Sequence, residues 1–281
     1  MEIKQNPFSF YDFLGYFVPG SIFIYFVIGI SAHALPEINI YSKLSENTNL
    51  NGAELYAPLI LAAYIAGHLI SFVSAVTIEK YSTWMYGYPS KVLLNLPRPN
   101  YFDASSRPIR RSIIRVFVFL IIFPISIIDV VLIKTLKLGE LLNKPLDPLL
   151  IKIINKRMID LLSKHAGIKS PGEGVTANNS DFFRYMYHYA LENAPNHVSK
   201  MQNYVALYGL LRAITLCSVI VFWVAAWHLI YSSASMTTAA ITLTLIMLIT
   251  YLFYMAFIKF YRRFSLEAMM AASVAYAASP N

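Results

Sequence analysis

Four apolar stretches, each long enough to cross a lipid bilayer, constrain this chain more than any other feature of its sequence. They cover residues 13–32, 56–77, 205–231 and 237–259. A helix needs about 20 apolar residues to cross a hydrocarbon core of roughly 30 Å. Of the 281 residues, 57% are hydrophobic and only 14% are charged, which is unusual for a soluble globular chain. The sequence therefore predicts an all-α integral membrane protein with four transmembrane helices.

The distribution of charge predicts how these helices are oriented, because basic residues accumulate on the cytoplasmic side. Residues 33–55 hold one lysine and three glutamates and are predicted to form an outer loop. Residues 78–206 hold 17 of the 23 basic residues against nine acidic ones, and the C-terminal tail is also basic. We expect both termini in the cytoplasm. Helices one and two then occupy 1–77, a basic helical cytoplasmic domain 78–200, and helices three and four 201–281.

The apolar segment 112–134 is interrupted by Arg115, Pro124 and Asp129. If it crossed the membrane, the basic residues that follow would lie outside, against the charge rule. We favour either a re-entrant hairpin bent at Pro124 or a pair of helices buried in the cytoplasmic domain and against the membrane surface. Asp129 is expected at a helix end or at the hairpin tip, with a proton-coupled role as the alternative.

Two more helices are predicted within the cytoplasmic domain. The first is amphipathic and spans 145–165, with Lys152, Lys156 and Lys164 on its polar face. Its apolar stripe consists of Leu149, Leu150, Ile153, Ile154, Met158, Leu161 and Leu162. We favour packing of this stripe into a protein core over contact with anionic lipid or another subunit. After a loop, the second helix is expected to begin at Ser180 or Asp181, residues suited to N-capping.

Catalytic motifs are absent from the sequence, which has no P-loop, no HExxH and no GxSxG elbow. The single cysteine, Cys217, lies in an apolar stretch and cannot form an intramolecular disulfide. The histidines are scattered, and no paired Cys or His stands at metal-ligand spacing. We therefore expect no enzymatic activity, no cofactor and no metal site.

The second apolar stretch carries polar side chains at intervals of three and four residues. These are Tyr64, His68, Ser71 and Ser74. This spacing places them on one face of a helix. The face is predicted to line a water-filled pore when several subunits surround an axis. Packing between helices by small and hydrogen-bonding residues is the alternative.

Basic and aromatic residues occur together in the predicted cytoplasmic domain and at the start of helix three. They are Arg107, Arg110, Arg111, Arg184, Tyr185, Tyr187, His188, Lys200 and Arg212. Basic groups neutralise phosphates and exposed rings stack on bases, so these residues are predicted to bind a nucleotide or a single-stranded oligonucleotide. The alternative is that the arginines mark the cytoplasmic boundary and the tyrosines belong to a core.

The strings YDFLGYFVPGSIF, AYIAGHLISFVSAVTIEKY and GYPSKVLL resemble parts of bacterial multi-pass membrane effectors of anti-phage nucleotide-signalling systems, such as the Hailong type. The resemblance covers residues 8–95 and extends to FIKFYRRFSLEAM near the C-terminus. It implies an oligomeric ion channel in the bacterial cytoplasmic (inner) membrane, controlled by a nucleic-acid-like product of a soluble partner enzyme.

These observations lead to the hypothesis of a homo-oligomeric channel in a lipid membrane, gated by a nucleotide or oligonucleotide bound to its cytoplasmic domain. Four spans in which the sequence shows no buried ion pair are too few for a single-chain pore, so a symmetric assembly is expected. The alternative is a non-conducting membrane scaffold or sensor that recruits a soluble partner. An enzyme acting on lipid headgroups ranks last, because Asp103, His165 and His188 are scattered.

Overall fold

A computed structural model describes residues 12–34, 42–43, 46, 54, 56–96, 109–136, 144–166, 182–232 and 235–278. All the regular elements in these ranges are helices, which confirms the predicted all-α class. Four helices are long and apolar enough to cross a membrane: Phe13–Ser31, Tyr56–Leu93, Pro195–Tyr231 and Met236–Ala277. Most of the predicted outer loop and the predicted N-cap at Ser180 or Asp181 lie outside the described residues.

The chain divides into two compact units, which are described separately below. Unit 1 comprises residues 1–79, 120–128 and 206–257, and unit 2 comprises 80–119, 129–205 and 258–281. Unit 1 therefore contains most of the apolar stretches. Unit 2 contains most of the basic segment, but it also includes 258–281, and unit 1 includes 120–128.

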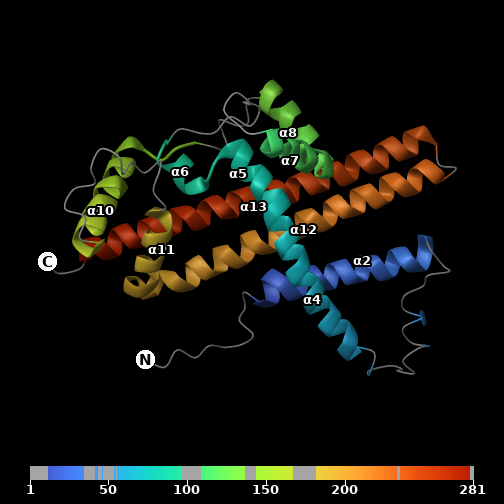
Figure 1. Cartoon of the computed structure of the whole chain (residues 1–281), viewed down its shortest axis with the longest axis horizontal. Coiled ribbons are helices and arrows are strands. Elements are labelled where there is room, and N and C mark those ends of the chain that lie inside the picture. Colours follow the sequence, from blue (N-terminus) through green and yellow to red (C-terminus); the bar gives the residue numbers. More distant parts are fainter. Residues whose placement is uncertain are drawn as a thin grey trace. The chain divides into compact units, whose positions relative to one another are not determined.

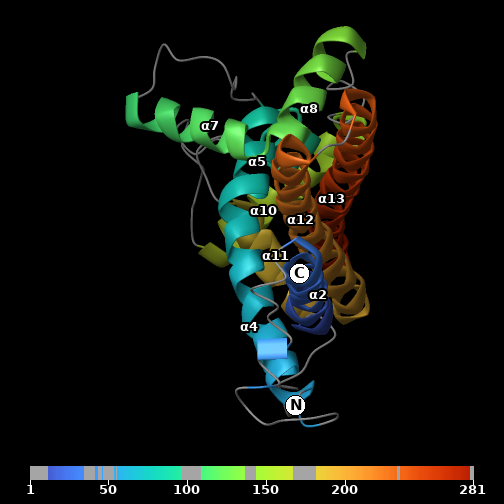
Figure 2. The same cartoon turned by 90° about the vertical axis from the view of Figure 1, so that its right-hand side faces the viewer.

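In unit 1, the first span pairs with the second (Figures 1 and 2). The first span consists of a π-helical turn, η1 (Phe13–Phe17), and α2 (Val18–Ala34). Because Pro19 has no N–H to donate to the preceding turn, the regular α-helical ladder is interrupted here. The second span consists of α4 (Tyr56–Ser74) and a second π-helical turn, η4 (Ala75–Glu79). A Cβ at Gly20 would overlap the Ala63 carbonyl, so glycine is needed for this close approach.

The two C-terminal helices lie side by side, antiparallel, in both views (Figures 1 and 2). α12 runs from Pro195 to Tyr231 and α13 from Met236 to Ala278. Proline fits the first turn of α12 because the N–H groups there have no partner within the helix. The predicted fourth span, 237–259, lies within α13. The helix continues for about another five turns beyond it.

The segment predicted as a bent hairpin forms two helices, α7 (Ile109–Ile121) and α8 (Phe123–Leu136), bent by 98°. The break is at Ile122, two residues before Pro124, whose ring excludes the carbonyl four residues earlier. The Ile122 carbonyl accepts the N–H groups of Ile125 and Ser126, at 2.8 and 3.0 Å. Trp223 donates its indole N–H to the Ile121 carbonyl at 2.7 Å. The carbonyl groups of Ile121 and Ile122 at the break thus accept hydrogen bonds.

Unit 2 is built around α10 (Pro148–Ala166), α11 (Phe182–Asn193) and parts of α12 and α13, with the short helices α5 (Lys80–Tyr86) and α6 (Pro89–Leu93). Its core includes Ile154, Met158 and Leu161 of the predicted amphipathic helix. The lysines on the other face of α10 are exposed. The core-facing interpretation of this helix is therefore confirmed, although Leu149 and Ile153 remain exposed.

Candidate functional site

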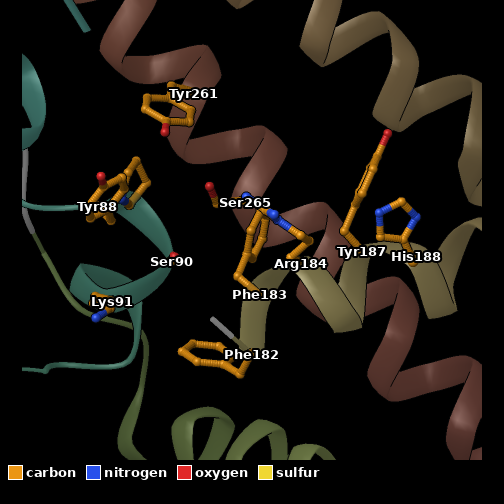
Figure 3. Close-up of a pocket in the computed structure, with 11 residues that line it drawn as sticks. Tyr88, Ser90, Lys91, Phe182, Phe183, Arg184, Tyr187, His188, Tyr261 and Ser265 are labelled. Atoms are coloured by element: carbon orange, nitrogen blue, oxygen red, sulfur yellow. The ribbon is translucent and has the colours of Figure 1, made fainter. Parts of the chain in front are cut away.

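A pocket of about 770 Å³ opens in unit 2, between the turn before α6, the start of α11 and the middle of α13 (Figure 3). Figure 3 shows Tyr88 and Lys91 on one side of the pocket and Arg184 of α11 across from them. The lining residues are Tyr88, Pro89, Ser90, Lys91, Phe182, Phe183, Arg184, Tyr187, His188, Tyr261 and Ser265. They combine basic side chains, aromatic rings and hydroxyl groups in one cavity.

The sequence of α11 explains why its polar residues face the pocket. Phe182, Met186 and Ala190 recur every four residues and are buried in the core of unit 2. This contact fixes the rotation of the helix, because residues four apart share a face. Arg184 and His188, also four apart, are consequently exposed. The apolar side anchors the helix while the basic side is presented to solvent.

Tyr187 forms part of an aromatic wall. Its ring packs edge-to-face on Phe264 and on His188, with centroid distances of 5.5 Å in both cases. Burial raises the pKa of the Tyr187 phenol above its ordinary value of 10.0. The hydroxyl therefore stays protonated at neutral pH and can donate a hydrogen bond to an anionic group.

The opposite wall depends on a sharp turn between α5 and α6. Gly87 adopts a φ of 85°, a conformation that side chains disfavour, and its N–H bonds the Thr83 carbonyl at 3.0 Å. This turn presents Tyr88, whose side chain is half exposed, and places Lys91 in the next helical turn. Ser90 and Ser265 are buried hydroxyl-bearing residues in the lining.

The pocket unites only some of the residues predicted to bind a ligand. Arg184, Tyr187 and His188 line it, whereas Tyr185 does not, although it belongs to the same helix. Arg110 and Arg111 are exposed on α7 and are not among the lining residues. Lys200 is also not among them: its Nζ lies 2.7 Å from the Glu267 carboxylate, which also bonds His197. Arg107 lies outside the described residues.

Several lining residues were missed by sequence reasoning, notably Lys91, Tyr88 and Tyr261. They are separated from α11 by long stretches of chain, and no spacing rule connects them to it. The sequence signal for Tyr88 and Lys91 was a short turn motif next to them. The Gly-Tyr-Pro sequence before Lys91 predicts a turn, and a turn is where a side chain can be presented.

The remaining predicted ligand residue, Arg212, belongs to unit 1 and lies within the third apolar stretch. Its guanidinium forms an ion pair with Glu79, and its Nε donates to Ser74 Oγ at 3.1 Å. Its Nη2 lies 3.3 Å from both the hydroxyl and the carbonyl oxygen of Ser71. The side chains of Arg212 and Glu79 are only 12% and 25% exposed. This cluster, Arg212 with Glu79, Ser71 and Ser74, is called the arginine network.

The arginine network contains a partly buried ion pair that sequence reasoning did not find. Glu79 stands just after the predicted end of the second span, and its charge was counted with the basic domain. Its position eight residues after Ser71 puts it on the same helical face. A charge within an apolar stretch needs such a partner, because an unpaired charge there is costly.

The predicted pore-lining face is therefore divided in two. Ser71 and Ser74 contact Arg212, and Ser74 is fully buried in this conformation. His68 is exposed and belongs to an aromatic group. Its ring stacks on Tyr16 with a centroid distance of 3.9 Å and meets Tyr64 edge-on at 4.7 Å. Packing and solvent exposure thus coexist on one face of α4.

Asp129 was expected at a helix end or at the hairpin tip. It lies instead inside α8 and is completely buried. Its carboxylate accepts hydrogen bonds from two phenol groups of α5, from Tyr81 at 3.0 Å and from Tyr86. The expectation was wrong because α8 begins at Phe123, so the tip of the bend falls well before Asp129. These tyrosines supply the hydrogen bonds that a buried carboxylate requires.

The described residues have the architecture of a helical membrane protein with an additional helical unit. Comparisons with protein-family models, curated proteins and solved structures found no match to this chain. Within the described part of the chain, no group of three or more His, Cys, Asp or Glu side chains is placed to hold a metal ion.

Proposed function

We propose that this protein is a homo-oligomeric ion channel of the bacterial inner membrane, gated by a nucleotide or a short oligonucleotide that binds in the unit 2 pocket. The pocket is the observation that carries the proposal. Its volume of about 770 Å³ lies within the range of small-molecule sites. The resemblance to anti-phage effectors supports a role in defence, with a soluble enzyme supplying the ligand.

The chemistry of the lining favours a nucleotide over other anions. Arg184 and Lys91 supply positive charge for a phosphate, and Arg can bind one through two hydrogen bonds. Tyr88 and Phe183 offer rings on which a base can stack. The neutral Tyr187 phenol and the serine hydroxyls can bind sugar or base edges. A purely inorganic anion would not use this aromatic wall.

The arginine network supports conduction. Ionisable groups inside membrane-spanning helices are rare and commonly mark ion pathways or moving elements. His68 and Tyr64 are further polar residues of α4, the helix that also carries Ser71 and Ser74 of the arginine network. His68 is exposed in the single chain. Such a residue is unfavourable against lipid, so a symmetric assembly that gathers His68 around an axis would place it in water.

Ligand binding by the pocket is tested with Arg184→Gln, measured by calorimetric titration of the purified full chain with AMP and with a short single-stranded oligodeoxynucleotide. Losing one charge-assisted contact is expected to weaken binding roughly tenfold to a hundredfold. Lys156→Gln is the matched control, because Lys156 is an exposed cation on α10 outside the pocket lining. Equal affinities for the wild type and both variants would exclude the pocket as the site.

Binding without any ion flux would leave the pocket in place and replace the channel by the non-conducting scaffold or sensor. In that case the arginine network has a packing role only. The exposed basic pocket would then serve to recruit a nucleotide-bearing partner to the membrane.

A further inference from the structure

α7 exposes a continuous apolar stripe that nothing in the described structure covers. Its members are Ile109, Ile113, Val116, Phe117 and Leu120, between 56% and 80% exposed. Their spacing of four, three, one and three residues places all five on one side of the helix. This stripe is referred to below as the α7 apolar stripe.

The rotation of α7 is fixed by contacts on its other side. Val118 is buried, and Phe119 packs edge-on against Tyr81 with a centroid distance of 6.5 Å. The Arg115 guanidinium lies 5.1 Å from the centre of the Trp84 ring, a cation–π contact. The α7 apolar stripe is thus held away from the protein by specific packing on α5.

The charges on α7 identify what covers the stripe. Arg110 and Arg111 are exposed in the first turn of the helix. The sequence contains no Asp or Glu between Asp103 and Asp129, so this part of the chain is purely cationic. An apolar face beside arginines is the pattern of helices that lie in the interface of a membrane with anionic lipids.

A second copy of the chain fits this surface less well. In an antiparallel pairing of two α7 apolar stripes, Arg110 and Arg111 would meet no acidic partner on the other helix. In a parallel pairing about a two-fold axis, the arginines of both copies would approach each other. Like charges brought together in this way are repulsive. The lipid headgroup instead supplies the missing negative charge.

We propose that α7 is an interfacial helix whose apolar stripe lies at the boundary of headgroups and acyl chains, with Arg110 and Arg111 binding the phosphates of anionic phospholipids. This assigns the two arginines to lipid and not to the nucleotide ligand. The proposal is independent of the pocket and of conduction.

The test uses the full chain in liposomes, labelled with an environment-sensitive dye at Phe117→Cys in a Cys217→Ala background. A brominated phospholipid is expected to quench the dye strongly and iodide weakly. Lys156→Cys, on the exposed face of α10, is the control and should show the reverse. Ile113→Cys gives a second readout on the same stripe if Phe117→Cys does not insert.

The arginines are tested by comparing liposomes with and without phosphatidylglycerol. Anionic lipid is expected to increase lipid quenching at position 117. The Arg110→Gln, Arg111→Gln double variant should lose this increase, since each arginine contributes about a fivefold preference for an anionic surface. A persisting increase in the double variant would contradict the assignment of the arginines.

Three outcomes would overturn the proposal as a whole. One is iodide quenching at position 117 as strong as at position 156. Another is energy transfer between labelled copies at position 117 without lipid quenching, which would identify a subunit interface. The third is protection from iodide that appears only when an oligonucleotide is added, which would return the arginines to the nucleic-acid ligand.

Discussion

At the scale of single residues, the arginine network shows how a charge is tolerated in an apolar stretch. Arg212 is nearly buried, and its hydrogen bonds go to Glu79 and to two serines one turn apart. Sequence reasoning found Ser71 and Ser74 because their spacing is regular. It could not connect them to Arg212, which lies over 130 residues further along the chain.

Removing the carboxylate of Glu79 from its ion pair with Arg212 is expected to destabilise the protein markedly. Glu79→Gln leaves the Arg212 charge without its carboxylate and should lower the free energy of unfolding by about 2–3 kcal/mol. This is less than for a fully buried pair, because Glu79 is a quarter exposed. The Glu79→Gln, Arg212→Met double variant should lose less than the sum of the two single variants. Thermal unfolding in detergent measures all three, and strict additivity would contradict a direct interaction.

Lys200 and Glu267 provide the comparison for that experiment. Their ion pair is also short, but the Lys200 side chain is 55% exposed. Exposed pairs contribute little because water screens them and the long side chain loses freedom. Lys200→Gln should therefore change the unfolding temperature less than Glu79→Gln does.

At the scale of helices, the apolar blocks predicted the spans but not the full length of the helices that contain them. The fourth span was predicted over 237–259, and the helix that contains it, α13, continues to Ala278. It does so because Ala268, Met269 and Ala272 are buried in the core of unit 2. This stabilisation comes from tertiary packing, which a hydropathy pattern does not predict. The helical spacing of Arg184 and His188 on α11 was, in contrast, readable from the sequence.

The pairing of the first span with α4 gives a prediction at the same scale. A Cβ at Gly67 would overlap the backbone carbonyl of Tyr16 in η1, so Gly67→Ala must separate η1 from α4 and should cost about 1–3 kcal/mol of stability. Gly29→Ala is the matched control, because a Cβ there meets nothing within 4 Å. It should be neutral or slightly stabilising, since alanine favours helix. The stability of both variants is measured by thermal unfolding in the same detergent. Equal losses of stability would contradict the close packing at Gly67.

At the scale of the whole molecule, two properties were accessible from the sequence and one was not. The membrane class follows from hydropathy, and the helical class from the length and spacing of the apolar segments. The pocket was only partly accessible, because its walls come from α6, α11 and α13. Only the fold brings Lys91, Arg184 and Tyr261 to one cavity, and no periodicity in the sequence records that proximity.

The central claim is that a ligand in the pocket controls an ion path. It is tested most directly by ion flux through liposomes that contain the purified protein, with and without a short single-stranded oligodeoxynucleotide. A gated channel should give flux that changes when the oligonucleotide is added to the side carrying unit 2. Arg184→Gln should shift that response to roughly tenfold to a hundredfold higher oligonucleotide concentration while keeping basal flux, and Lys156→Gln should behave as the wild type. Absence of flux under every condition, with all three proteins correctly inserted, would contradict the channel.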